Sequence, residues 1–102
     1  MKVLTDEFEQ ELKKITKLSS VVNENHEQKI LAMMKDHVDE IIDLYQEGND
    51  HYRIEIADLI VLSFELLLIE KNDIDTIFTE CLPRFFRKID QLKFTEKKLK
   101  EI

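Results

Sequence analysis

Apolar residues recur every three or four positions along most of the chain, which is the pattern of amphipathic helices. In residues 1–25 this pattern predicts an amphipathic N-terminal helix, with Thr5 as its N-cap. The run from Ser19 to Asn25 weakens the pattern, so a break in the helix is expected there. The side chains predicted to face inward are Leu4, Phe8, Leu12, Ile15 and Leu18.

Two further helices are predicted in the middle of the chain, at residues 26–47 and 51–70. Gly48, the only glycine, is well placed to end the first of them in a left-handed conformation. The second half of helix 51–70 is apolar nearly all round, which indicates the central helix of a bundle or a helix in an oligomer interface. The inward side chains predicted for helix 26–47 are Ile30, Leu31, Met34, Val38, Ile41, Ile42 and Tyr45.

A fourth helix is predicted after a connector at residues 72–75, with Asp75 as its N-cap. It extends to about residue 92 and is followed by a basic C-terminal end, residues 93–102. Pro83 falls inside this helix, so a kink or a restart is expected near residues 80–82. Its apolar side chains are Ile77, Phe78, Leu82, Phe85, Phe86, Ile89 and Leu92.

The composition agrees with a helical protein. The chain has 102 residues, with one Gly, one Pro and no Trp, and 43% of its residues are hydrophobic. So few helix breakers, in a chain long enough for one core, predict a single all-α domain. The connections are short, so we expect a compact antiparallel four-helix bundle in which a partner chain covers the third and fourth helices.

The charge distribution narrows the class of partner. The net charge is −7, which argues against nonspecific binding to nucleic acid. Twelve carboxylates and two cations lie between Asp36 and Asp75, whereas seven cations and two acids lie between Arg84 and Lys100. Such an acidic middle suits divalent cations. Cys81 is the only cysteine, and the start of the chain lacks the apolar core of a signal peptide, so a cytoplasmic protein outside the membrane is expected.

Two pairs of acids, each three residues apart, lie on neighbouring predicted helices: Glu40 with Asp43, and Glu55 with Asp58. A short connection makes these helices antiparallel, so the two pairs can face each other. Converging carboxylates would suit Mg²⁺ or Mn²⁺, although charges at this spacing also mark solvated helix faces. Glu65, two turns beyond Asp58, either extends this polar seam or is exposed.

The stretch HVDEIIDLYQEGNDHYRIEIADLIVLSFELLLIEKNDIDTIF resembles the core of the MazG-like proteins, members of the all-α nucleoside triphosphate pyrophosphohydrolases. Both have paired acids on one helix, a glycine-containing turn, and E-x-x-D leading an apolar helix. The resemblance covers residues 36–92, within a core of residues 26–92. It implies a MazG-like domain over residues 1–102 that forms a homodimer or a dimer of dimers.

The resemblance also implies an activity. In that superfamily four acidic positions hold Mg²⁺, which grips a nucleoside triphosphate while water cleaves it to the monophosphate and pyrophosphate. Glu40, Glu55 and Asp58 match three of these positions, and His37 occupies the fourth. Either the nearby Asp36 or Asp43 compensates for this change, or the site is degraded and the chain is a non-catalytic interaction or dimerisation protein.

The resemblance suggests roles for individual residues as well. Glu40 or Glu55 would act as the general base. Metal ligands would come from Glu40, Asp43, Glu55, Asp58 and His37. Basic residues that bind the triphosphate would be Arg84, Arg87 and Lys88, with Lys35 and Arg53 as further candidates. His51 shares a helix face with Glu55 and Asp58 and could orient them. The spacing of His26, His37 and His51 matches no known metal motif.

Overall fold

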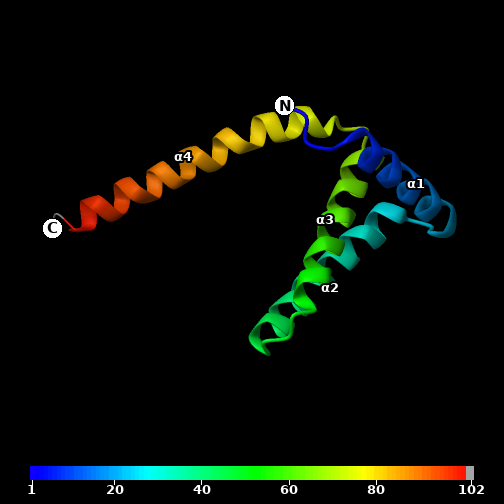
Figure 1. The fold of residues 1–102 in the computed structure, drawn as a ribbon, viewed down its shortest axis with the longest axis horizontal. Helices are drawn as coiled ribbons and strands as arrows, with labels where there is room; N and C mark the ends of the chain where they lie inside the picture. Colours follow the sequence, from blue (N-terminus) through cyan, green and yellow to red (C-terminus); the bar gives the residue numbers. More distant parts are fainter. Residues whose placement is uncertain (101–102) are drawn as a thin grey trace. The chain divides into compact units, whose positions relative to one another are not determined.

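The protein contains four helices and no strand within the residues that the structure, a computed structural model, describes: residues 1–100, with side chains through Thr95. The helices are α1 (Asp6–Val22), α2 (His26–Gln46), α3 (Tyr52–Ile69) and α4 (Ile74–Lys100), as labelled in Figure 1. The prediction of an all-α fold is confirmed. In this described part of the chain, every helix is too short or too polar to cross a membrane.

The chain divides into two units, one of residues 4–72 and the other of residues 1–3 together with residue 73 onward. The first unit contains α1, α2 and α3, and the second contains α4. A four-helix bundle would need helices of both units, so the compact bundle stays a prediction.

In the unit of residues 4–72, α3 is the central helix. It contacts both α1 and α2, and it lies antiparallel to α2 in a helical hairpin (Figure 1). Leu12 and Ile30 are fully buried in its core, and Leu62 and Phe64 contribute from the apolar half of α3. Within this unit the apolar helix is therefore central, which agrees with the first of the two alternatives predicted for it.

Helix α1 begins as predicted but continues further than expected. The Thr5 hydroxyl accepts a hydrogen bond from the Phe8 N–H at 3.1 Å, which confirms the N-cap. The helix runs through the serines to Val22, and the break comes at residues 23–25, where Asn25 has a φ of 52°. Leu18 was predicted to face inward, but this side chain is exposed. The same correction applies to Phe8 and Ile15 of α1, and to four side chains of α2, namely Leu31, Val38, Ile42 and Tyr45.

Helices α2 and α3 end with the same hydrogen-bonding pattern. After α2, the Gly48 N–H donates to the Tyr45 carbonyl and the Asn49 N–H donates to the Leu44 carbonyl, at 3.2 and 2.9 Å. Gly48 has a φ of 72°, so its predicted left-handed stop is confirmed. After α3, Lys71 occupies the equivalent position with a φ of 58°, although it is not a glycine. These two turns set where α3 starts and ends.

The second unit is built on α4, whose N-cap differs from the prediction. The Asp73 carboxylate accepts from the Asp75 N–H at 3.2 Å and from the Thr76 hydroxyl at 2.9 Å, so Asp73 is the cap. The Asp75 carboxylate accepts instead from the Val3 N–H at 2.7 Å. The predicted cap at Asp75 is therefore wrong by two residues, because the connector is shorter than the sequence suggested.

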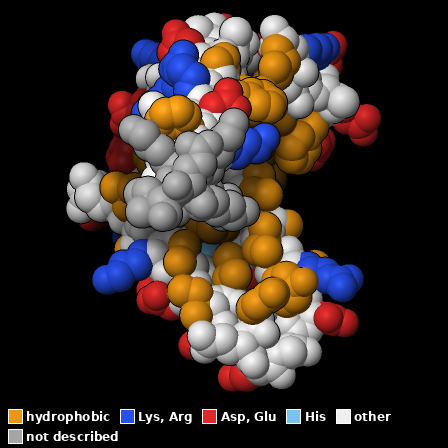
Figure 2. Space-filling view, turned by 90° about the vertical axis from the view of Figure 1, so that its left-hand side faces the viewer, with side chains coloured by type: hydrophobic (Ala, Val, Ile, Leu, Met, Phe, Trp, Pro, Cys, Tyr) orange, Lys and Arg blue, Asp and Glu red, His pale blue; other side chains and the backbone are white. Residues whose placement is uncertain are grey.

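Helix α4 runs without interruption through Pro83, so the expected restart near residues 80–82 does not occur. Several of its apolar side chains are exposed, among them Phe85, Phe86 and Leu92. Figure 2 shows hydrophobic side chains at the molecular surface, interspersed with charged ones. The predicted basic end, residues 93–102, lies outside the described side chains from residue 96 onward.

Candidate metal centre

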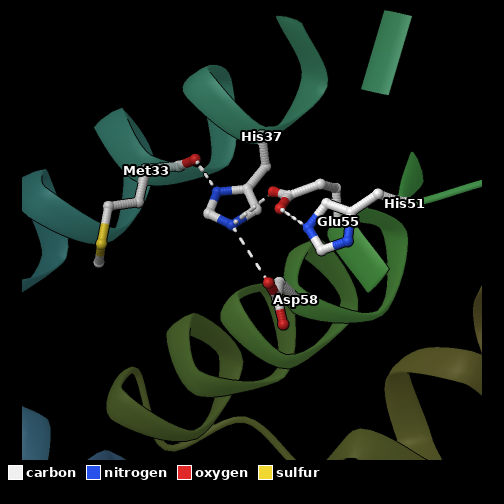
Figure 3. Close-up of polar contacts among 5 residues, drawn as sticks. All are labelled: Met33, His37, His51, Glu55 and Asp58. Carbon is white, nitrogen blue, oxygen red and sulfur yellow. Dashed lines mark hydrogen bonds and ion pairs between the residues drawn. The ribbon is translucent and has the colours of Figure 1, made fainter. Parts of the chain in front are cut away.

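The site is built around His37, which projects from α2 towards α3 (Figure 3). Its Nδ1 lies 2.7 Å from the carbonyl oxygen of Met33, one turn earlier in the same helix. A carbonyl oxygen can only accept a hydrogen bond, so Nδ1 carries a hydrogen and donates it. The other ring nitrogen, Nε2, is left facing α3.

Two carboxylates of α3 lie opposite this nitrogen. Nε2 of His37 is 3.3 Å from Oε2 of Glu55 and 3.7 Å from Oδ2 of Asp58. The second oxygen of Glu55, Oε1, lies 3.3 Å from Nε2 of His51 (Figure 3). The Glu55 side chain is only 12% exposed, whereas Asp58 is half exposed. The site thus has an inner side at Glu55 and an open side at Asp58.

The electrostatics of the site show in two pKa values. The pKa of His37 is raised above its ordinary value, first by the hydrogen bond to Met33 and then by the negative charges of Glu55 and Asp58, against an opposing effect of burial. The pKa of Glu40 is also raised, because its carboxyl hydrogen-bonds with Glu55 and faces the negative charge of that residue. His37 and Glu40 therefore each hold a proton more tightly here than they would in solvent.

His37, Glu55 and Asp58 form a group that could hold a metal ion. One ligand atom from each lies within 4.8 Å of the other two, and this is the only such group among the residues that the structure describes. Glu40 lies close enough to Glu55 for a side-chain hydrogen bond, which places it at the rim of the group. The two helices therefore bring together His37, Glu40, Glu55 and Asp58 of the predicted ligand set.

Other predicted site residues lie elsewhere. Asp43 is exposed and lies outside the metal-capable group. Within the described residues His26 is likewise not part of that group, so the three histidines do not form one site. Arg84, Arg87 and Lys88 are exposed on α4, in the other unit, and their role towards a triphosphate stays a prediction. Lys35 and Arg53 are exposed in the same unit as His37.

A pocket of about 380 Å³ adjoins the metal-capable group. His37 and Asp58 form part of its wall, and the rest is apolar. The apolar lining comes from α1 and α3, through Ile15, Val61 and Leu62. A small organic group bound in this pocket would therefore touch two of the three candidate ligands.

Two buried polar side chains were not anticipated. Glu65 is only 4% exposed, and its Oε1 has no hydrogen-bond partner, so the alternative in which Glu65 is exposed is wrong. His26 is also buried, and neither ring nitrogen is hydrogen-bonded. Helical periodicity places Glu65 near the polar seam, but its burial follows from the contacts of α3 with α1 and α2.

Sequence reasoning found the acidic residues but missed two parts of the site. It gave no role to the Met33 carbonyl, because a backbone acceptor leaves no signal in the sequence. It placed Ile15 on an inward face of α1 but did not identify the pocket that Ile15 lines. The signal for that pocket was weak, since it depends on where α1 meets the helical hairpin.

Comparison with family models, with curated proteins and with solved structures finds no match for this chain. The MazG-like resemblance therefore rests on the acidic motifs and their spacing alone.

Proposed function

We propose that this protein is a divalent-metal-dependent nucleotide pyrophosphohydrolase, which cleaves a nucleoside triphosphate to the monophosphate and pyrophosphate. The observation that supports this most is the convergence of His37, Glu55 and Asp58 from two antiparallel helices. Phosphoryl-transfer sites work by positioning and charge neutralisation, and a bound cation with carboxylate ligands supplies both. The MazG-like resemblance gives the reaction class.

The residues of the chain have distinct tasks in this reaction. His37, Glu55 and Asp58 would hold the ion, which would neutralise phosphate charge and activate a water molecule. Glu40 would accept the proton that this water loses as its oxygen bonds to phosphorus and the α–β phosphoanhydride bond breaks. Its pKa is raised above the ordinary value of a glutamate, which favours the uptake of a proton. His51 holds Glu55 in place through their 3.3 Å contact.

The pocket beside the cluster supports a nucleotide as substrate. At about 380 Å³ it is within the size range of small-molecule sites, and its apolar wall suits a nucleobase or a sugar. A nucleotide with its base in this pocket would present its phosphates to His37 and Asp58.

The proposal predicts which substitutions abolish hydrolysis. Purified protein is incubated with each nucleoside triphosphate and Mg²⁺ or Mn²⁺, and the release of monophosphate and pyrophosphate is measured by ion-exchange chromatography. Glu55→Gln and Asp58→Asn should each lower kcat/KM about a hundredfold or more, because each removes a charge from the cation site.

The matched control is Asp39→Asn, which removes an exposed carboxylate from α2 outside the cluster and should leave kcat/KM unchanged. Circular dichroism establishes that every variant is folded. The proposal is wrong if no nucleoside triphosphate is cleaved with either ion, or if the α3 variants hydrolyse it as fast as the control.

A second candidate function is that of a non-catalytic interaction protein that associates with itself through α4. Phe86 and Leu92 are 68% and 70% exposed, and such apolar surface on a helix favours association. We propose a homodimer or a dimer of dimers as the state of the protein under either function. Association without hydrolysis would favour this second candidate.

A further inference from the structure

The orientation of the His37 ring restricts the kind of cation that the site can take. Because Nδ1 donates its hydrogen to the Met33 carbonyl at 2.7 Å, the neutral ring has its lone pair on Nε2. That lone pair faces the acceptor oxygens of Glu55 and Asp58. Three acceptors that face one another repel unless a proton or a metal ion lies among them.

The spacing of these atoms suits a metal ion. Charge-assisted hydrogen bonds between nitrogen and a carboxylate are about 2.7–2.9 Å long, shorter than the 3.3 and 3.7 Å found here. Two atoms that each lie about 2.1 Å from one ion, at the roughly 90–110° angles of octahedral or tetrahedral coordination, are about 3.0–3.4 Å apart. The contact from His37 to Glu55 falls in that range, and the contact to Asp58 exceeds it by a few tenths of an ångström.

The donor set does not suit Mg²⁺. Mg²⁺ prefers oxygen ligands in octahedral geometry and loses its water reluctantly. Imidazole nitrogen, in contrast, binds first-row transition ions well. The affinity of mixed nitrogen and carboxylate sites for these ions rises from Mn²⁺ to Co²⁺ and then to the later ions. The hydrogen bond from Nδ1 to a backbone carbonyl is also the usual support of a ligating histidine.

We propose that His37, Glu55 and Asp58 form a site selective for a divalent first-row transition ion over Mg²⁺, with Nε2 of His37 as the ligand that decides the selectivity. This inference deepens the proposed function, on which it rests for the use of the ion, by naming its class. His51 contacts Oε1 of Glu55, the oxygen that does not face His37, so His51 is a positioning residue.

The experiment is a titration of the metal-free protein with Co²⁺, Mn²⁺, Zn²⁺ and Mg²⁺, followed by isothermal calorimetry. We expect Co²⁺ to bind at least about a hundredfold more tightly than Mg²⁺, in line with the preference of nitrogen donors. In His37→Glu the ratio of the two dissociation constants should fall about tenfold or more, because an oxygen ligand replaces the nitrogen.

Proton NMR of the Co²⁺-loaded protein identifies the ligand directly. A metal-bound histidine whose Nδ1–H is hydrogen-bonded gives a strongly shifted, exchangeable ring proton signal. One such signal is expected in the native protein, retained in His51→Gln and lost in both His37→Glu and His37→Gln. The second His37 variant covers the case in which the glutamate variant does not fold.

The inference is overturned if Mg²⁺ binds as tightly as Co²⁺, if the ratio is unchanged in the His37 variants, or if the shifted proton disappears in His51→Gln instead. A hydrolysis assay distinguishes a failure of the proposed metal selectivity from a failure of the proposed function. Tight Mg²⁺ binding with active hydrolysis sinks the selectivity alone. Co²⁺ binding through His37 with no hydrolysis of any nucleoside triphosphate sinks the proposed function alone, and binding of no ion sinks both.

Discussion

At the scale of single residues, His37 has the largest effect on what the site can do. It stands where the resemblance expects an acid, and it faces two carboxylates across the helical hairpin. A histidine here keeps the number of possible ligands, but it replaces a fixed negative charge by a group that is neutral or positive. The charge balance of the metal-free site therefore depends on pH.

This dependence gives a prediction for stability in metal-free buffer. The pKa of His37 is raised above 6.5 in the folded state, so protonated His37 stabilises the fold. That contribution is complete below pH 6.5 and is lost as the pH rises through the raised value. The substitution His37→Gln should thus lower the free energy of unfolding, relative to the native protein, by about 0.5–1 kcal/mol more at pH 5.5 than at pH 9.

Urea denaturation with a chelator present measures this difference at each pH. Asp39→Asn, an exposed change on the same helix, should show no such trend. A constant difference between the native protein and His37→Gln across the range would mean that the carboxylates of α3 do not stabilise the charged ring.

At the scale of helices and turns, most of the architecture follows from local sequence signals. The periodic apolar residues, the Thr5 cap and the Gly48 stop all act over four or five residues, so they are legible without tertiary contacts. The cap at Asp73 could also be predicted from the sequence, but Asp75 is an equally suitable N-cap residue by type. The Val3 N–H, distant in sequence, occupies the Asp75 carboxylate.

Substitutions in the two left-handed turns should change the free energy of unfolding in opposite directions. Gly48 has a φ of 72° and open space where a Cβ would be, so Gly48→Ala should cost about 1 kcal/mol from backbone strain alone. Lys71 already bears that strain at a φ of 58°, so Lys71→Gly should stabilise the protein by up to about 1 kcal/mol. Urea denaturation followed by circular dichroism measures both. Two changes of the same sign would contradict the assignment of these turns.

At the scale of the whole molecule, the exposed apolar side chains of α4 are the main feature left unexplained by the fold of either unit. Helix α4 carries them at spacings of three and four, so they form a stripe along one side. A stripe of this kind on a helix favours packing against another helix. The oligomer inferred from the apolar third and fourth helices would supply such a partner.

We predict that substitutions in this stripe dissociate the oligomer. The double variant Phe86→Lys with Leu92→Lys should sediment as a monomer at concentrations where the native chain sediments as a dimer or a tetramer. Val21→Lys, an equally exposed apolar position on α1, should keep the native state. Analytical ultracentrifugation distinguishes these states. A native chain that is monomeric throughout would refute the prediction.

By itself, the sequence determined four helices and the turn between α2 and α3, because periodicity and turn chemistry act locally. Only the tertiary structure decided that His37 rather than Asp43 faces Glu55, that the Met33 carbonyl orients its ring, and that Glu65 is buried. These depend on how each helix is rotated about its axis and on which side chains the neighbouring helix covers. Rotation and cover are set by packing between segments far apart in the chain, which a local pattern does not record.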